Sequence, residues 1–306
     1  MVISNKYINL CTLEGNMRRN ELSLYTILKY LFIGVVAFSI IYPMLNILSI
    51  SLSDTLPIMK NEISFYPKGI NFKAYIIVLS SNDLLRAYLN TVKYVVLGTV
   101  ISMTITTCGA YALSKGKLLF GYKFFTILII ITMFFDGGLI PNYLTMKSLG
   151  LLNTTWIIIL IGGVNAWNLI VMRTFFKTIP SDLQDSGRVD GLNEYGILWN
   201  IVLPCSTAIL TTISLFYAVA QWNAYFVPFI YLTDPVKYPL QIILKQLLIA
   251  GTNRSQEAAS GMGDSLVIGE SLVNATIIVS IIPIVAIYPF LQKYFVKGIM
   301  LGSLKG

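Results

Sequence analysis

The chain has 306 residues, of which 56% are hydrophobic and only 12% are charged. A soluble domain of average composition has about 25% charged residues, so this chain has too few charges to cover a water-facing surface. It contains no histidine, which excludes histidine general bases, Ser-His-Asp triads and His-ligated zinc sites. The net charge of +8 is spread thinly, without the basic stripe of a nucleic-acid-binding protein. The three cysteines form no CxxC pair: Cys11, Cys108 and Cys205.

The charged residues leave five long gaps in the sequence. They are 30–53 (24 residues), 94–114 (21), 148–172 (25), 195–233 (39) and 271–292 (22). A membrane-spanning helix needs about 20 mostly apolar residues to cross a core of about 30 Å, and each gap is long enough. A sixth segment is apolar except for Asp136. Because these runs do not alternate like barrel strands, the sequence predicts an all-α integral membrane protein with six transmembrane helices. In chain order they are 26–52, 89–113, 124–144, 154–174, 200–222 and 270–292.

Lysine and arginine predict the orientation, because they are enriched in cytoplasmic loops. Six spans put both termini on one side, and 13 of the 22 basic residues fall on that side. The others lie mostly in two long loops, where charge has little influence on topology. We therefore expect a multi-pass protein with both termini in the cytoplasm. The 13 residues are Lys6, Arg18, Arg19, Lys29, Lys115, Lys117, Lys123, Arg173, Lys177, Arg188, Lys293, Lys297 and Lys305.

Domain boundaries follow from the spans. Residues 1–25 are expected to form a cytoplasmic N-terminal segment and residues 293–306 a cytoplasmic tail, on either side of a transmembrane domain over 26–292. The first span is too long for the apolar part of a cleavable signal peptide, so it is predicted to be a permanent anchor. The outer loops 53–88 and 223–269 have a length typical of functional loops, with simple connection as the alternative.

The cytoplasmic loop 175–204 is unusual, because it holds a cluster of five of the chain's 36 charges between residues 182 and 194. Ser181 and Gln184 have the capping-box spacing for the start of a short helix, and Gly191 can adopt the positive φ that ends it. The loop is therefore predicted to form a short amphipathic helix, a turn and a second helix, placed to contact a soluble partner. A solvated loop without a partner is the alternative.

This loop resembles the EAA loop of ABC-importer permeases, whose pattern is EAA, three residues, Gly, nine residues and I-x-L-P. Asp185-Ser186-Gly187 stands at the EAA position, Gly191 at the glycine and Ile201-Val202-Leu203-Pro204 at the end, without a gap. Aspartate replaces glutamate, and serine and glycine replace two alanines. Because glycine inside a helix costs about 1 kcal/mol relative to alanine, the helix is expected to be softer than usual.

Two further stretches resemble the permeases that import complex oligosaccharides, the LplC/YtcP-like group within the maltose-type carbohydrate class. They are Phe135–Pro141 with its continuation to Leu151, and Tyr288–Gly298 with the closing Gly302–Gly306. The resemblance spans nearly the whole chain. It implies the type I importer permease fold with a cytoplasmic coupling helix, a place in the bacterial plasma membrane, and a permease subunit that is not itself an enzyme.

The resemblance also implies partners. They are a second homologous permease subunit, two ABC ATPase subunits, an extracellular solute-binding lipoprotein that delivers the oligosaccharide, and membrane lipid. No G-x-x-x-x-G-K-[ST] motif occurs, so ATP and Mg²⁺ are expected to bind the partner ATPases, and this chain is expected to hold neither cofactor nor metal.

Specific residues are implied to contact those ATPases. In the coupling loop they are Asp182, Leu183, Asp185, Ser186, Gly187, Val189, Asp190, Gly191 and Pro204. In the tail, Gly298, Gly302 and Lys305 are expected to contact the ATPases as well, with anchoring on anionic lipid as the alternative.

Candidates for the substrate path are polar and aromatic residues of the fourth and fifth spans. Asn165 and Trp167 fall inside the fourth predicted span, where polar groups are costly. Trp222, Asn223 and Tyr225 cluster at the outer end of the fifth. Aromatic faces and amides suit sugar rings, but interfacial aromatics also form membrane belts and asparagines also bond helix to helix. Both interpretations remain open.

The main rival class is an ion-coupled secondary sugar transporter, which usually has paired ionisable groups near the bilayer midplane. Asp136 is the only acid in the interior of a predicted span. The adjacent Gly137-Gly138 and Pro141 favour a cap or an outer-mouth contact over a proton relay. A membrane-embedded enzyme would need a nucleophile with a base, or a metal cluster, and the sequence has no such constellation.

Overall fold

The computed structural model describes residues 2–258, 270–286 and 289. These residues form helices joined by turns, with a single isolated β-bridge among them, between Ser53 and Ile70. The prediction of an all-α protein is confirmed. The chain divides into two compact units, one of Met1–Tyr75 with Ser255–Ile278 and one of Ile76–Arg254 with Val279–Gly306.

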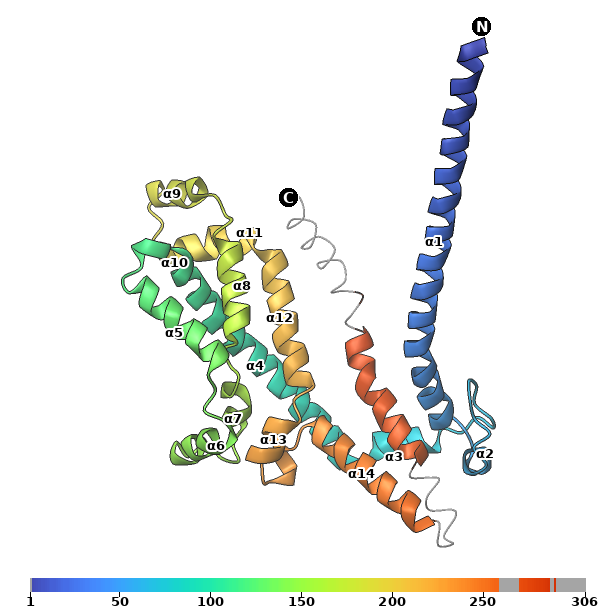
Figure 1. The fold of residues 1–306 in the computed structure, drawn as a ribbon. Coiled ribbons are helices and arrows are strands. Elements are labelled where there is room, and N and C mark those ends of the chain that lie inside the picture. The colour runs from blue at the N-terminus through green and yellow to red at the C-terminus, as the bar shows by residue number, and fades with distance from the viewer. Residues whose placement is uncertain (1, 259–269, 287–288, 290–306) are drawn as a thin grey trace. The chain divides into compact units, whose positions relative to one another are not determined.

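The first unit is built on α1 (Val2–Ser51), a single long helix (Figure 1). Its part Leu24–Ser51 is long and apolar enough to cross a membrane, which agrees with the first predicted span. The expected N-terminal segment 1–25 is not a separate element, because α1 begins at Val2 and no proline interrupts it before Pro43.

The predicted outer loop 53–88 contains helices. They are α2 (Thr55–Met59), α3 (Lys73–Ser80) and the first turns of α4. Asp54 ties the segment together, since its N–H donates to the Lys68 carbonyl at 3.1 Å and its carboxylate accepts from Asn71 Nδ2 at 2.8 Å. These short-range bonds hold the chain folded back on itself after α1.

Helix α4 (Asn82–Ser114) is the centre of the second unit, and α8 (Ala166–Phe176) and α12 (Thr207–Trp222) pack against it. It starts where Ser81 Oγ accepts a hydrogen bond from the Leu84 N–H at 3.4 Å. Gly109 lets α8 approach closely, because a Cβ there would lie 3.2 Å from Leu169 Cδ1. Small residues serve this purpose in membrane helix bundles.

The core of this unit also contains residues from the segment after α9 (Ser181–Val189). That segment is α10 (Glu194–Ile197), a π-helical turn (Leu198–Val202) and α11 (Leu203–Cys205). Its Ile197, Leu198 and Val202 are buried with side chains of the bundle helices, so the predicted coupling loop is packed into the bundle. The buried cluster is Ala110, Tyr111, Met172, Phe176, Ile179, Ile197, Leu198, Val202, Ile213 and Tyr217.

The predicted span 124–144 is broken. The chain bends by 119° between α5 (Tyr122–Phe134) and α6 (Leu139–Ser148), and a short 3-10 turn (Gly116–Leu118) precedes them. The first arm ends at Phe134, and Gly138, the residue before α6, has φ +83°. Asp136 Oδ1 accepts from the Gly138 N–H at 3.1 Å and from Asn142 Nδ2 at 3.0 Å. This acid therefore stabilises the break, as expected for a cap.

The predicted spans 154–174 and 200–222 are also broken. The first divides into α7 (Thr155–Leu160) and α8, because Gly162 takes φ +77° between them. The second bends by 87° at Ser206, between α11 and α12. Both charge-free runs therefore contain apolar helices, but their interruptions were not predicted.

The predicted outer loop 223–269 is partly helical as well. It contains α13 (Phe226–Tyr231), a 3-10 turn (Pro235–Lys237) and α14 (Leu240–Ala258). A further apolar helix, Glu270–Ala286, coincides with the start of the sixth predicted span. Within the described residues, two helices are long and apolar enough to span a membrane, or four if each bent pair counts as one. Six spans therefore remain a prediction.

Tyr217→Phe is expected to lower the thermal unfolding midpoint by a few degrees. The buried Tyr217 hydroxyl bonds Thr106 Oγ1 at 2.7 Å and accepts from the Asn165 N–H at 3.1 Å, so it joins α12, α4 and the start of α8. Phenylalanine would leave both groups without this partner, at a cost of about 1–2 kcal/mol. Tyr143→Phe is the matched control, since that ring stacks on Tyr231 and its hydroxyl has no hydrogen bond within the described residues. Equal midpoints for the two variants would contradict the prediction.

Candidate functional site

Helix α9 (Ser181–Val189) is the short helix predicted in loop 175–204, and it lies at one end of the second unit (Figure 1). The predicted sequence of helix, turn and second helix is confirmed. The predicted capping box is wrong, because Pro180 occupies the N-cap position and Ser181 makes no cap bond. Gln184 Oε1 instead accepts from Lys115 Nζ at 2.7 Å. Gln184 therefore connects α9 to the end of α4.

Two glycines fix how α9 sits. Gly191 has φ +84° and donates its N–H to the Arg188 carbonyl at 3.0 Å, so it makes the predicted turn. Gly187 is buried, and a Cβ there would lie 2.6 Å from Ile201 Cδ1 and 3.4 Å from Leu192 Cδ1. The expectation that Gly187 only softens the helix is incomplete, because its missing side chain lets α9 pack on the π-helical turn.

The outer face of α9 carries exposed side chains without a packing role. Val189 is 88% exposed and Leu183 is also exposed, so two apolar side chains stand on an otherwise polar helix. The acids Asp182, Asp185 and Asp190 are exposed too. This face combines exposed apolar side chains with negative charge, which is the composition expected of a helix that docks on another protein.

Ser186 and Pro204 have local roles. Ser186 Oγ donates to the Leu183 carbonyl at 2.9 Å, which satisfies the hydroxyl within α9. Pro204 lies inside α11, where it follows the π-helical turn. The Leu203 N–H bonds the Leu198 carbonyl, one residue further back than in an α-helix.

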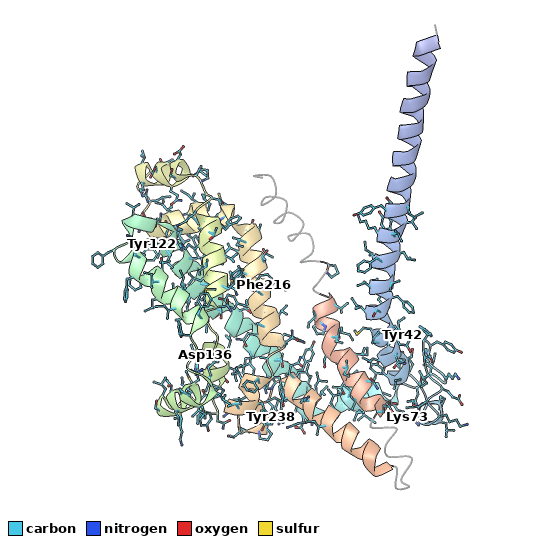
Figure 2. All side chains as sticks on the ribbon, in the orientation of Figure 1. Tyr42, Lys73, Tyr122, Asp136, Phe216 and Tyr238 are labelled. Carbon is cyan, nitrogen blue, oxygen red and sulfur yellow. The ribbon has the colours of Figure 1, made fainter. Side chains whose placement is uncertain are left out.

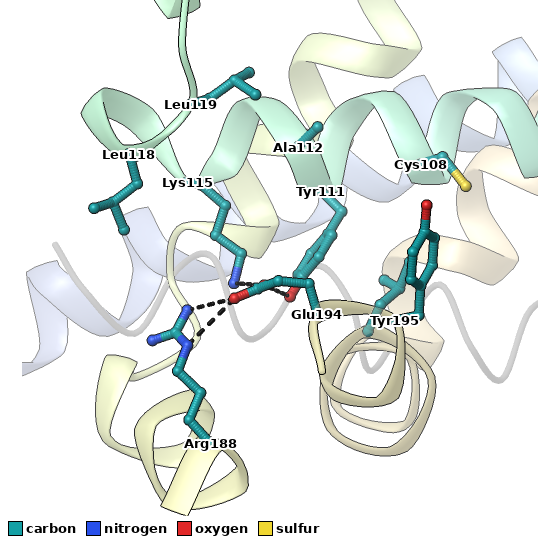
Figure 3. A pocket seen from close by; sticks show the side chains of 10 residues that line it. Cys108, Tyr111, Ala112, Lys115, Leu118, Leu119, Arg188, Glu194 and Tyr195 are labelled. Atoms are coloured by element: carbon teal, nitrogen blue, oxygen red, sulfur yellow. Dashed lines mark hydrogen bonds and ion pairs between the residues drawn. The ribbon is translucent and has the colours of Figure 1, made fainter. Parts of the chain in front are cut away.

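A glutamate not singled out from the sequence holds the site together (Figure 3). Glu194, the first residue of α10, accepts from Lys115 Nζ at 2.8 Å and from the Tyr111 hydroxyl at 2.7 Å. Its other oxygen accepts from Arg188 Nη2 at 2.9 Å and Nε at 3.2 Å. One carboxylate thus links the last turn of α9, the end of α4 and the start of α10. Tyr111, Lys115, Arg188 and Glu194 all line a cavity of about 430 Å³.

The contacts of Glu194 keep it ionised. The hydrogen bonds from Lys115, then Tyr111, and the one from Arg188 lower the pKa of Glu194 to about 2. The hydrogen bond to Glu194 and the charge of that carboxylate raise the pKa of Arg188. A carboxylate that accepts several hydrogen bonds from cationic donors is stabilised in its charged form. The link between α9 and α4 is therefore ionic at any pH near neutrality.

The five predicted substrate-path residues do not converge on one point. Asn165 lies at the break before α8 and caps that helix, accepting from the Asn168 N–H at 3.0 Å. Trp167 is 61% exposed. Trp222 is buried, with its ring centre 5.8 Å from that of Tyr88.

The remaining two residues have local contacts. Asn223 Nδ2 donates to the Val219 carbonyl at 3.0 Å, and the Tyr225 ring stacks on Phe229. Trp167 is therefore the most exposed aromatic of the five, and the substrate path stays a prediction. The tail residues Gly298, Gly302 and Lys305 lie outside the described residues.

Comparison with known proteins shows which family the chain belongs to. Residues 118–301 match the family described as binding-protein-dependent transport system inner membrane component. Two Bacillus subtilis (strain 168) proteins are each 36% identical to the chain. The polygalacturonan/rhamnogalacturonan transport system permease protein YtcP aligns over 92% of this chain and 99% of its own length, and Protein LplC over 92% and 95%.

A solved structure agrees with these relatives. The crystal structure of a bacterial ABC transporter involved in the import of the acidic polysaccharide alginate contains a chain that is 34% identical. It superimposes with a TM-score of 0.81 over 89% of this chain and 96% of that one. Together these matches define the chain as a permease of the ABC-importer class. The chain belongs to the family of binding-protein-dependent transport system inner membrane components, which are transport permeases and not enzymes.

Proposed function

We propose that the chain forms half of the translocation path of an ATP-driven importer for an oligosaccharide in the bacterial plasma membrane. The names of YtcP and of the alginate transporter support a carbohydrate substrate. A second permease subunit completes the path, two ATPase subunits supply the energy, and an extracellular solute-binding lipoprotein delivers the sugar. Both termini lie in the cytoplasm, as the distribution of lysine and arginine favours.

The packing of α9 carries this proposal. The helix is held on one side by Gly187 against Ile201 and by Glu194 through Arg188, and its other side exposes Val189 and Leu183. A helix that is rigidly held and has exposed apolar side chains for a partner to contact can transmit the movement of that partner into the bundle. ATP binding can bias such a two-state switch only through contacts that differ between the states.

Val189→Asp tests the coupling contact. Because Val189 is exposed, the variant should insert and unfold like the wild type, whereas a charge in an apolar docking pocket should lower ATP-driven uptake about tenfold or more, as expected for an interface hot spot. Uptake and ATP hydrolysis would be measured in proteoliposomes that contain the complete importer. Gly191→Pro should have a similar effect, since proline cannot adopt φ +84° or donate the N–H to Arg188.

Leu149→Asp is the matched control. Leu149 is an exposed apolar residue directly after α6, and α6 lies at the end of the second unit away from α9 (Figure 1). Its change should leave the coupling of hydrolysis to uptake unaltered. Normal uptake by Val189→Asp would show that this face of α9 is not the contact. Uptake that stops when the proton gradient is collapsed while ATP remains would favour the ion-coupled transporter instead.

A further inference from the structure

Two cations without an acidic partner lie at the end of α8 that leads into α9. Arg173 Nη2 and Lys177 Nζ both donate to the Tyr122 hydroxyl, the latter at 3.3 Å. The guanidinium carbon lies 5.1 Å and the ammonium nitrogen 5.5 Å from the centre of the Tyr122 ring. Within the described part of the chain, no carboxylate approaches either cation within 4.0 Å. Figures 1 and 2 place Tyr122 at the same end of this unit as α9.

This cluster has uncompensated positive charge. Arg173 and Lys177 are four residues apart on one helix, an arrangement in which like charges repel. Burial lowers the pKa of Lys177, and the charge of Arg173 lowers it further. Tyr122 accepts hydrogen bonds from both cations but, as a neutral phenol, does not cancel their charge. Arg173 Nε is buried without a hydrogen-bond partner. An anion beside the Arg173 and Lys177 side chains would relieve this repulsion.

The surroundings indicate which anion. Lys123 is exposed beside Tyr122, and α5 continues with exposed apolar side chains at Phe124, Ile127 and Leu128. Positive charge at the end of an apolar helix matches an amphiphile with a negative head and hydrocarbon tails. Basic clusters between helices at a membrane surface bind anionic lipid headgroups, and arginine and lysine both suit phosphate oxygens.

We propose that Arg173, Lys177 and Tyr122 bind the phosphate of an anionic phospholipid whose acyl chains lie along α5. Arg173 and Lys177 contact the phosphate oxygens, and the Tyr122 hydroxyl donates its own hydrogen to one of them. A zwitterionic lipid is disfavoured, because its amine adds a positive charge to a site that already has an excess. The bound lipid neutralises the end of α8, next to the segment that leads into α9.

The test is native mass spectrometry of the intact importer in detergent with equal amounts of phosphatidylglycerol and phosphatidylcholine. The wild type should retain phosphatidylglycerol preferentially. Arg173→Gln with Lys177→Gln should weaken that retention about twenty-five-fold, from roughly five-fold for each charge near a membrane surface, and leave phosphatidylcholine unchanged. If the double variant does not assemble, Lys177→Gln alone changes one exposed side chain and should show the five-fold effect.

The matched control is Arg86→Gln with Lys93→Gln. It also removes one arginine and one lysine, but from the N-terminal half of α4, whereas Tyr122 follows the C-terminal end of that helix. It should keep the lipid preference of the wild type. Unchanged phosphatidylglycerol retention in the Arg173 and Lys177 variants would overturn the proposal. Displacement of the lipid by millimolar inorganic phosphate would show a site for free phosphate instead. Loss of a partner subunit with lipid retention intact would identify the anion as an acidic protein segment, which also overturns it.

Discussion

Replacing Gly187 by leucine is expected to uncouple ATP hydrolysis from transport. Even a Cβ at this position would lie 2.6 Å from Ile201 Cδ1, so a leucine must push α9 away from the π-helical turn. Inserting side-chain atoms into a packed contact costs about 1–3 kcal/mol, which corresponds to a decrease of about five-fold to a hundredfold in the population of correctly docked α9. Uptake should fall by that factor in the reconstituted importer, while ATP hydrolysis continues.

Alanine at the same position separates steric displacement from loss of glycine. The atom that a new Cβ would meet is the end of the Ile201 side chain, which can rotate away, so Gly187→Ala should show a smaller loss. Combining it with Ile201→Val removes the clashing Cδ1 and should restore uptake to the wild-type level. If Gly187→Ala and the double variant are equally impaired, the contact with Ile201 does not position α9.

The position of α9 could be predicted from the sequence because its determinants are local. The run of charges that interrupts the apolar segments, together with Gly191 and the I-x-L-P ending, lies within about 25 residues. The structure confirms a short helix and a turn at Gly191. The start of the helix was assigned to the wrong residue, because Gln184 has a better partner in Lys115 of a distant helix, and spacing alone does not reveal such a partner.

The sequence analysis did not predict the breaks in these helices, because hydropathy carries no information about backbone conformation. Residues 124–144 and 154–174 are apolar enough to span a membrane, yet Gly138 and Gly162 adopt positive φ within them. The glycine pairs Gly137-Gly138 and Gly162-Gly163 were the available signal. In lipid a break survives only where other groups satisfy the freed backbone, as Asp136 and Asn165 do here. A polar residue beside a glycine pair in an apolar run therefore predicts an interruption.

The Glu194 network could not have been predicted, because its partners come from distant parts of the chain. Tyr111 and Lys115 precede Glu194 by about 80 residues, and no sequence spacing relates them. In the sequence, Glu194 is one of five charges in a loop and looks like a solvating residue. Only the folded arrangement shows that Glu194 bonds the side chains of three residues at once, whereas Asp185, at the EAA position, pairs with Arg188 alone among the described residues.

Glu194→Gln is expected to loosen α9 from α4 and to reduce transport coupling as strongly as the Gly187 change. The glutamine amide lacks the negative charge that Lys115 and Arg188 contact. Its NH₂ group is also a hydrogen-bond donor, so it cannot accept from these two donors. Lys115, whose side chain is only 14% exposed, would keep its charge without a counterion. The loss should be about 1–2 kcal/mol. This is less than the value of about 1.5–3 kcal/mol that is typical of hydrogen bonds to charged groups, because the Glu194 side chain is 53% exposed and water partly replaces its contacts. Limited proteolysis in the α9 loop and uptake per ATP hydrolysed would measure it.

The pH dependence of that effect distinguishes an ionic link from a packing defect. Since the pKa of Glu194 is lowered from its ordinary value of 4.5 to about 2, its stabilising contribution is complete above pH 4.5 and is lost as the pH falls toward 2. The difference in unfolding midpoint between wild type and Glu194→Gln should therefore be constant from pH 6 to pH 8 and shrink below pH 4.5. Glu62→Gln, which breaks one exposed pair with Lys68, should change neither stability nor coupling. A midpoint difference that persists unchanged down to pH 2 would mean that the carboxylate charge does not hold α9 to α4.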